Sequence, residues 1–452
     1  MSPIDEIDAD TRSRQRYMRA GWGYAATISA RAVSFLVAIV TIPLTLPYLG
    51  PERFGMWMTI ISFATLLSFA NVGIGVSLMT SIARDDGRGE VAAQRASISN
   101  ALALGALAAL ILAVGTGIIW PFISWQRVLN VESSIAAAEA GPSMAVFAAT
   151  FLVSVPLGLV SSIWDGLQRS YVVGLFLAVG SLLGIAGIAG SVATHQGLPV
   201  LVASSSVGPL AALMMSAALL FRKRPDLRPS ARLIRMGAVR GLLGVGVGFF
   251  VLQVAIAVAT SSDPLVLAQV IGPASVAEYS VVARLFNVPL QLAVSVAFAL
   301  WPGFSEARSR GDDDWAAVAM RRVVLLTMGI AVPLVAALVV IGPEVARLLT
   351  NESMQPGVGL YVAFAFATVA VVLASTISVF LNSAGVVWPQ VICWTTMAVC
   401  NILLGIWLSG MLGTSGVVWA TAITEGLLLV PLVLLGRRLL PGSTTTEWTT
   451  GS

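Results

Sequence analysis

The sequence predicts an all-α polytopic membrane protein with about twelve transmembrane helices. Its 452 residues are 57% hydrophobic and only 11% charged, with a mean hydropathy of +0.90. A soluble domain has about 45–50% apolar and about 25% charged residues, so these few charges cannot cover a water-exposed surface of this size. Tryptophans also cluster at the ends of the apolar runs, as in the aromatic belts of membrane interfaces. This composition excludes a soluble multidomain enzyme and a disordered chain.

Each apolar run is long enough to cross a bilayer as a helix, which needs about 20 residues. A helix is expected because an open strand would leave backbone groups unpaired in lipid. In chain order the predicted spans are 22–48, 55–82, 97–120, 143–164, 171–193, 198–221, 241–262, 274–302, 323–342, 357–382, 388–410 and 415–436.

The Lys and Arg residues predict the orientation of these spans. Most of the 26 precede the first span or lie in alternate loops, which the positive-inside rule places in the cytoplasm. Only Arg53, Arg127 and Arg347 fall on the opposite side, while Arg31 and Arg284 fall inside spans. Both termini are therefore expected in the cytoplasm. The basic pI reflects this topology rather than nucleic-acid binding.

A polar, basic stretch near the middle divides the chain into two halves of six predicted spans. Gly50-Pro51 separates the first two spans of one half, and Gly272-Pro273 separates the first two of the other. Two halves in the same orientation predict parallel repeats, related by an axis along the membrane normal. The expected regions are a cytoplasmic tail at 1–21, an N-lobe at 22–221, a basic cytoplasmic linker at 222–240, a C-lobe at 241–438 and a second cytoplasmic tail at 439–452.

One predicted span, 274–302, carries a polar stripe around a deep arginine. Ser280, Asn287, Gln291 and Ser295 share a helix face with Arg284. An ionisable side chain at membrane depth costs at least about 2.5–3.5 kcal/mol, so it needs a role. The stripe is expected to line a water-filled cavity. The alternative is an interhelical hydrogen-bonded seam.

Weaker signals of the same kind occur in two other spans. Arg31 shares a face with small and hydroxyl residues in the first span, but it lies near the cytoplasmic end and could snorkel there. In the seventh span Gly246, Gln253 and Thr260 recur at heptad spacing, which is more typical of packing than of binding.

Three carboxylates fall within or beside predicted spans. Glu425 lies deep in the last span, with Thr421 on its face, while Asp263 and Glu278 lie near the outer ends of the seventh and eighth spans. A buried carboxylate can take up a proton or Na⁺. The alternatives are a salt bridge to a partner such as Arg284, or solvation at the membrane interface.

The chain offers little material for catalysis. It has one histidine, His195, and two cysteines, Cys393 and Cys400, which lie on one helix face and suit core packing. No nucleotide-binding loop and no nucleophile–base arrangement appears. The sequence therefore predicts no metal site, no cofactor and no enzymatic activity, and any uphill transport must draw on a gradient.

Several segments resemble a known family over nearly the whole chain. They resemble the bacterial flippases of O-antigen and other polysaccharides, within the multidrug/oligosaccharidyl-lipid/polysaccharide exporter superfamily. The segments that carry the resemblance are 48–57 (YLGPERFGMW), 69–75 (FANVGIG), Asp263, 271–273 (IGP), 278–285 (EYSVVARL) and 301–302 (WP).

The resemblance implies two six-helix lobes around a central cavity, with alternating access. Its members move undecaprenyl-diphosphate-linked oligosaccharides of O-antigen, capsule or exopolysaccharide across the bacterial inner membrane. Arg31 and Arg284 would then receive the anionic diphosphate or acidic sugars, with Gln253, Asn287 and Gln291 as further substrate contacts. Coupling to H⁺ or Na⁺ would use the three carboxylates. Membrane lipids, and a glycan polymerase or glycosyltransferase, are the expected partners.

Other readings of the sequence stay open. A cation-coupled multidrug exporter of the same superfamily would be expected to place acids rather than arginines in its cavity. A membrane polymerase or ligase needs a large outer loop, but the longest one, 121–142, offers only Arg127, Glu132 and Glu139. The several clustered cavity arginines of the peptidoglycan-precursor flippases are absent, which disfavours that branch.

Overall fold

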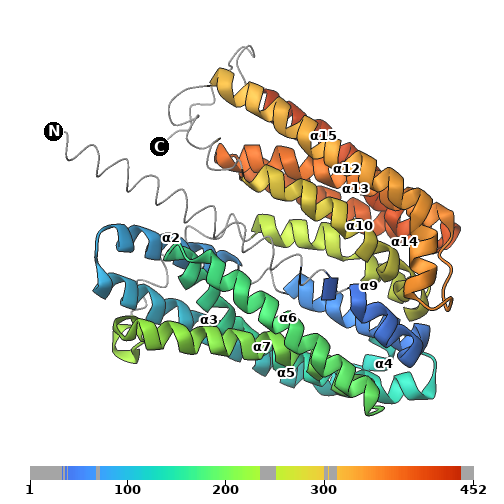
Figure 1. The fold of residues 1–452 in the computed structure, drawn as a ribbon, viewed down its shortest axis with the longest axis horizontal. Coiled ribbons are helices and arrows are strands. Elements are labelled where there is room, and N and C mark those ends of the chain that lie inside the picture. The colour runs from blue at the N-terminus through green and yellow to red at the C-terminus, as the bar shows by residue number, and fades with distance from the viewer. Residues whose placement is uncertain are drawn as a thin grey trace. The chain divides into compact units, whose positions relative to one another are not determined.

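The computed structural model describes residues 33, 36–37, 39–67, 72–234, 251–299, 304 and 313–438. Within these residues the helices are joined by turns and short loops, and there is no strand. Figure 1 shows the ribbon with its helices labelled. The all-α prediction is therefore confirmed for the described part of the chain.

The long helices of the earlier part of the chain follow residues 39–67, which are themselves helical. They are α2 (Val72–Gly87), α3 (Val91–Ile119), α5 (Ser134–Gly166), α6 (Ser170–Ala193) and α7 (Leu198–Lys223), with a short α4 (Trp125–Val128) between α3 and α5.

The later part begins with a helix at Val251–Ser261, bent by 45° from the one that follows it. The remaining helices are α9 (Asp263–Val270), α10 (Pro273–Ala299), α12 (Asp313–Leu349), α13 (Val358–Ser383), α14 (Trp388–Leu412) and α15 (Thr414–Arg438).

The chain forms two compact units that are not simply its two halves. We call the unit that holds Leu67–Val128 and Glu132–Phe250 the N-unit. The C-unit holds everything from Val251 onward together with two earlier pieces, Leu49–Leu66 and Leu129–Val131. Each unit is described below by itself.

In the N-unit, α7 packs against both α6 and α5. Small residues allow the close approach of α6 and α7, because a Cβ on Gly208 would meet the backbone of Gly180 and Gly184. Ile82 and Trp164 belong to a core cluster of this unit. Trp164 Nε1 also donates a hydrogen bond of 3.0 Å to Ser216 Oγ on α7. These contacts make α5, α6 and α7 one bundle.

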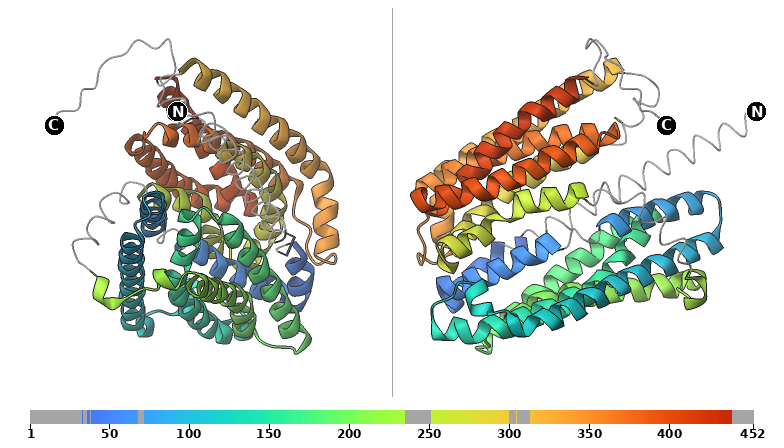
Figure 2. Two further views of the ribbon diagram at one scale, coloured as in Figure 1. Left: turned by 60° about the vertical axis from the view of Figure 1, so that its left-hand side comes forward. Right: turned by 180° about the vertical axis from the view of Figure 1, so that it is seen from behind.

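In the C-unit, α13 occupies the centre and is the most buried span, since it packs against α10, α12 and α15, while α14 packs on α15. The two views of Figure 2 show these later helices, yellow to red, gathered in one bundle. Buried Leu252, Trp394, Met397 and Leu432 belong to one of its core clusters. A polar site placed among α9, α10, α14 and α15 is therefore inside packed protein.

Local sequence signals account for several helix ends. The Ser133 hydroxyl accepts from the Ala136 amide at 3.3 Å and caps α5. Proline stands at the start of α7 and of α14, where no intrahelical donor is needed. Gly413, with φ of +61°, ends α14 and allows α15 to begin directly afterwards.

The two glycines of the predicted repeat both have a positive φ. Gly50 has φ of +74° and Gly272 has φ of +122°, a region that L side chains rarely adopt. Pro273 then begins α10. Within the C-unit, a Cβ on Gly55 would clash with the Pro273 carbonyl, so the first Gly-Pro segment packs tightly against the second.

Nine described helices are long and apolar enough to cross a membrane, or ten if the bent pair at Val251–Val270 is one span. The chain is thus a multi-pass membrane protein, while twelve spans remain a prediction because several predicted ends lie outside the described residues. Most helices are longer than their apolar runs: α12 has 37 residues where the sequence predicted 323–342. Such a helix continues past the hydrocarbon layer, which is about 30 Å thick.

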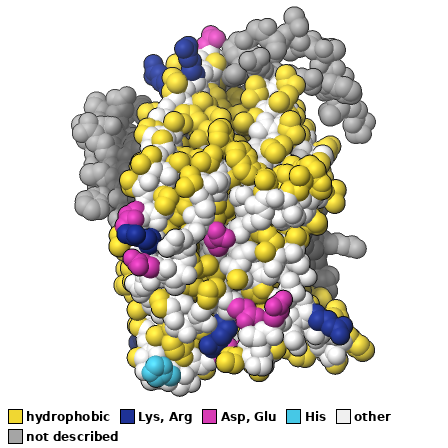
Figure 3. All heavy atoms as spheres, turned by 90° about the vertical axis from the view of Figure 1, so that its right-hand side faces the viewer, with side chains coloured by type: hydrophobic (Ala, Val, Ile, Leu, Met, Phe, Trp, Pro, Cys, Tyr) yellow, Lys and Arg dark blue, Asp and Glu magenta, His cyan; other side chains and the backbone are white. Residues whose placement is uncertain are grey.

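Exposed apolar side chains fit a lipid environment. On the face in Figure 3, hydrophobic side chains cover much of the surface and charged ones are few. Val340, Leu348 and Ile392 are more than 60% exposed, at 79%, 67% and 67%. Surfaces this apolar are not tolerated in water.

The described part of the predicted basic linker is not one helix. After α7 it forms two single turns, Pro225–Leu227 and Ala231–Leu233. Arg224 donates to both carboxylate oxygens of Asp226, and this hydrogen bonding lowers the pKa of Asp226. Residues 235–250 lie outside the described part.

Candidate functional site

A buried carboxylate, Asp263, begins α9 in the C-unit and is 6% exposed. Thr421 Oγ1 lies 3.0 Å from its Oδ2, and Tyr279 donates its hydroxyl to the same oxygen at 3.3 Å. The Asn401 amide reaches its Oδ1 at 3.5 Å. Three donors from α10, α14 and α15 therefore converge on one carboxylate, as a buried charge requires.

The bend before α9 explains how this cluster forms. The helix Val251–Ser261 ends just before Asp263, which frees backbone carbonyls near the break. Asn401 donates to one of them, the Ala259 carbonyl, at 2.9 Å. Because α14 and α15 are joined by the tight turn at Gly413, Asn401 and Thr421 reach Asp263 together, with their side-chain oxygens 3.3 Å apart.

Glu425 lies one turn beyond Thr421 on α15 and is completely buried. Neither of its carboxylate oxygens has a hydrogen-bond partner within the described part of the chain. An ionised carboxylate in such a place carries a penalty of several kcal/mol. It is stable there only when neutral or when a cation lies beside it.

Glu278 has a different environment from the other two acids. It is only half-buried on α10, and it accepts a hydrogen bond of 2.7 Å from Thr414 Oγ1, at the start of α15. This contact ties α10 to the turn between α14 and α15. The structure therefore gives Glu278 a structural contact, and its predicted coupling role remains a prediction.

The residues of the predicted polar stripe lie on α10, and Arg284 among them is half-buried. Arg284 Nη2 lies 3.2 Å from Met58 Sδ within the C-unit, and Arg284 makes further interactions as well. A thioether is a weak acceptor. Farther along the helix, Asn287 and Gln291 are exposed, and neither amide has a hydrogen bond to the described residues.

The other predicted substrate contacts are less informative. Gln253 is half-buried on the helix Val251–Ser261. Arg31 lies outside the described residues. Thr421 bonds to Asp263 and lies one turn from Glu425, so the two acids belong to one region of the C-unit. Of the two predicted substrate-binding arginines, only Arg284 lies within the described residues.

Sequence reasoning missed Asn401 as a member of the acidic cluster. Its signal was present, because an amide in the middle of an apolar run is as unusual as a charge. The sequence places Thr421 on the face of Glu425 but not beside Asp263. Tyr279 carries no such signal, since hydroxyl residues are common in spans and usually bond to their own helix.

Buried carboxylates and a half-buried arginine in the spans of a helical membrane protein are typical of transporters. The chain belongs to the polysaccharide biosynthesis protein family, whose family model matches residues 20–308. A second family model, lipid II flippase MurJ, matches residues 170–450.

Solved structures share the fold. The chain superposes on an inward-facing multidrug resistance MATE family transporter of the MOP superfamily with a TM-score of 0.75 and 19% identity, covering 91% of this chain and 97% of that one. It superposes on the lipid II flippase MurJ, in an inward closed conformation, with a TM-score of 0.74 and 14% identity, covering 91% of this chain and 87% of that one. It also superposes on a MOP superfamily transporter from Pyrococcus furiosus with a TM-score of 0.65 and 17% identity, covering 93% of this chain and 94% of that one.

These comparisons confirm the resemblance to the exporter superfamily. Identities this low show the fold alone, and a comparison with curated proteins finds no match. The MurJ match also means that the absence of clustered arginines does not remove the peptidoglycan-precursor branch from consideration. The family models support a lipid-linked flippase as the general function.

Proposed function

We propose that this protein carries undecaprenyl-diphosphate-linked oligosaccharides, units of O-antigen, capsule or exopolysaccharide, from the cytoplasmic to the outer leaflet of the bacterial inner membrane. The observation that carries the proposal is Arg284, an arginine within a membrane helix of a chain that belongs to the polysaccharide biosynthesis protein family. Guanidinium binds phosphate oxygens in a bidentate manner and keeps its charge in an apolar setting.

In this proposal the two predicted lobes, 22–221 and 241–438, enclose a cavity that opens alternately to each side. Arg284 and Arg31 hold the diphosphate. Asn287, Gln291 and Gln253 offer amides to the sugars. The exposure of Asn287 and Gln291 on α10 supports this assignment. Both termini and the 222–240 linker lie in the cytoplasm, where a glycosyltransferase or polymerase can deliver or receive the glycan.

We further propose that the acidic cluster supplies the coupling. Asp263 with the oxygens of Asn401 and Thr421 suits Na⁺, a hard cation that prefers oxygen ligands. Glu425, with no partner of its own, suits a proton. A cation that enters this cluster in one orientation of the transporter and leaves in the other would drive the cycle, with Glu278 near its outer edge.

A second candidate function is a cation-coupled multidrug exporter. The observation that favours it is the acidic cluster, which is more completely built than the arginine site in the described residues. Drug-susceptibility profiling of a deletion strain separates the two. Hypersensitivity to several drugs, together with normal surface glycan, would favour the exporter.

The direct test in cells is the location of the lipid-linked glycan after deletion of the gene. The proposal expects glycan to accumulate on the cytoplasmic leaflet, and expects wild-type protein but not Arg284→Ala to restore delivery. The matched control is Arg347→Ala, because Arg347 is exposed at a helix end and forms an exposed ion pair with Glu344 at 2.7 Å. Full delivery by Arg284→Ala would remove Arg284 from the site.

A further inference from the structure

The first part of the linker after α7 is fixed on the start of α3. Three hydrogen bonds join side chains of α3 to the linker backbone: Arg95 Nε donates to the Arg228 carbonyl at 2.7 Å, Ser99 Oγ accepts from the Ser230 amide at 3.0 Å, and Asn100 Nδ2 donates to the Leu233 carbonyl at 3.2 Å. We call these three bonds the clamp. Leu227 adds a buried contact, because it belongs to the core cluster that contains Trp164. Residues 225–234 are therefore part of the packed N-unit.

The position of this segment along α3 gives its depth in the membrane. The apolar run of α3 begins at residue 97, so Ser99 and Asn100 lie just inside it. Arg222 and Lys223 directly follow the apolar run of α7, and α7 packs against the turn Pro225–Leu227. Both helices thus place the segment at the level of the lipid headgroups. Because α3 is the least buried of the nine described candidate spans, this level is open to lipid.

Four exposed cations lie on this segment and the end of α7: Arg222, Lys223, Arg228 and Arg232. Contacts bring them together, because Arg228 Nε donates to the Phe221 carbonyl at 3.1 Å, next to Arg222. The clamp holds the backbone on both sides of Arg232. Ile234, which is 46% exposed, adds an apolar side chain. We call residues 222–234 the linker surface.

The acids beside the linker surface do not balance this charge. Arg224 and Asp226 form an ion pair of 2.8 Å and neutralise each other. One further acid, Asp86, interacts electrostatically with Arg224. Since a single acid does not balance four cations, the linker surface keeps a net positive charge. Clusters of four or more Lys and Arg residues next to a membrane span attract anionic lipid.

We infer that the linker surface binds the headgroups of anionic phospholipids, in the leaflet that the predicted topology makes cytoplasmic. Charge complementarity selects these lipids, since phosphatidylglycerol carries a net negative charge and phosphatidylcholine carries none. The clamp favours binding because it orders the backbone that carries Arg228 and Arg232, which lowers the entropic cost. The inference goes beyond the proposed function and does not depend on it, because binding is measured without transport.

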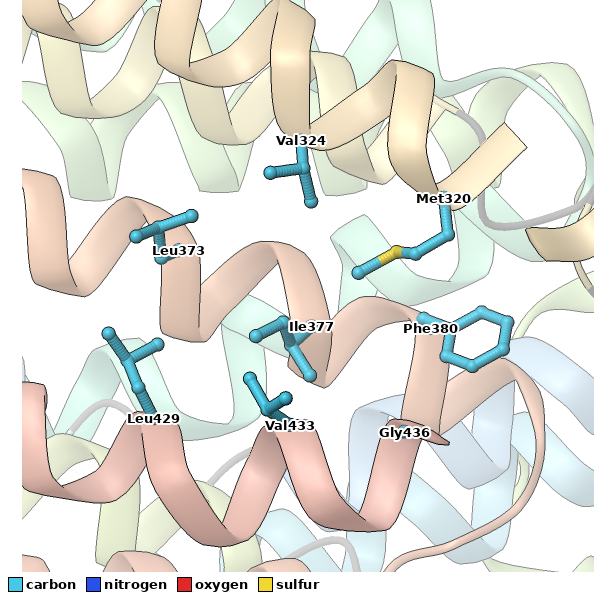
Figure 4. Close-up of a pocket in the computed structure, with 8 residues that line it drawn as sticks. All are labelled: Met320, Val324, Leu373, Ile377, Phe380, Leu429, Val433 and Gly436. Carbon is cyan, nitrogen blue, oxygen red and sulfur yellow. The ribbon is translucent and has the colours of Figure 1, made fainter. Parts of the chain in front are cut away.

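A pocket in the C-unit offers the opposite chemistry. It lies between α12, α13 and α15, has a volume of about 280 Å³ and is lined only by apolar residues, among them Met320, Ile377 and Val433 (Figure 4). Such a pocket can hold a hydrocarbon chain, but it presents no charged or polar side chain to a headgroup. It therefore provides a control for binding through the lipid chains alone.

The test uses the purified full chain in mixed micelles of phosphatidylglycerol and phosphatidylcholine. The lipids that the protein retains are quantified by mass spectrometry. We expect the wild type to prefer phosphatidylglycerol about tenfold, and Arg228→Gln with Arg232→Gln to remove most of that preference. The matched control is Arg321→Gln with Arg322→Gln, which removes the same charge from exposed positions just before the apolar run of α12. It should leave the preference unchanged.

The clamp is tested without changing any charge. Ser99→Ala removes the acceptor of the Ser230 amide, so the preference should fall about threefold and trypsin should cleave faster after Arg228 and Arg232. Ser205→Ala is the control, because Ser205 donates to the Val202 carbonyl of its own helix. Unchanged preference and unchanged cleavage in Ser99→Ala would contradict the role of the clamp.

Three other results would overturn the inference. Equal retention of the two lipids by the wild type would show that headgroup charge does not matter. A loss of preference in the Arg321/Arg322 control as large as in the linker variant would mean that any exposed cations suffice. A loss in Val433→Trp, which fills the apolar pocket, with none in the linker variant would place the lipid in that pocket.

Discussion

At the residue scale, the buried acids differ in how they are satisfied. Asp263 receives three hydrogen bonds from other helices, whereas Glu425 receives none in the described residues. In a dry setting this difference separates a group that can stay ionised from one that must hold a proton or a cation. The two acids are therefore expected to have different roles.

Glu425→Gln is the cleanest test of that difference. The change removes the charge at nearly constant volume, so the protein should unfold at the same temperature as the wild type or higher, while coupled transport should fall about tenfold or more. Thermal unfolding in detergent and a transport assay check it. Glu344→Gln, at an exposed pair, is the control. Normal coupled transport in Glu425→Gln would leave this carboxylate without a role.

Thr421→Val tests the hydrogen bonds of Asp263. Removing the hydroxyl 3.0 Å from Oδ2 should lower the free energy of unfolding by about 1–2 kcal/mol and alter the dependence of transport on Na⁺ or pH. Thr424→Val is the matched control, because Thr424 is buried on the same helix but bonds to carbonyls of its own helix. Equal effects of the two changes would argue against a special role for Thr421.

The sequence predicted these residues unevenly. Asp263 and Glu425 stand out because a carboxylate in an apolar run needs a reason. Their neighbours could not be predicted in the same way, because contacts such as Thr421–Asp263 depend on which helix faces meet. The periodicity of a single helix does not determine the angle at which it packs against another helix.

At the element scale, hydropathy located the spans but not their ends. It detects only the part of a helix in contact with lipid, so α5 begins at Ser134, while its predicted apolar run begins at 143. Its start is set instead by the Ser133 cap. The Gly-Pro pairs were more exact signals, because both glycines adopt a positive φ that the sequence pattern alone suggests.

Close packing between the two Gly-Pro segments can be tested at Gly55. A Cβ there would meet the Pro273 carbonyl, so Gly55→Ala should lower the free energy of unfolding by about 1–3 kcal/mol. Gly115→Ala is the control, because nothing lies within 4 Å of a Cβ at that helical position, and it should be neutral or slightly stabilising. Equal stability of both variants would mean that the segments can separate without cost.

At the scale of the whole molecule, composition alone identified a polytopic helical protein, and the Gly-Pro repeat suggested two related halves. The compact units do not follow those halves, since Leu49–Leu66 and Leu129–Val131 pack with the C-unit. Sequence could not predict this assignment, because it depends on long-range contacts. The family match extends across most of the chain, yet it leaves the glycan undetermined.

The most direct test of the central claim is transport of a lipid-linked oligosaccharide by the purified protein in liposomes. The lipid is placed in one leaflet and its appearance in the other is followed by accessibility to a glycan-binding lectin. We predict rapid exchange with the wild type and at least about tenfold slower exchange with Arg284→Ala, in line with the loss of one charged contact. No exchange above protein-free liposomes, with cation-driven movement of a drug instead, would contradict it.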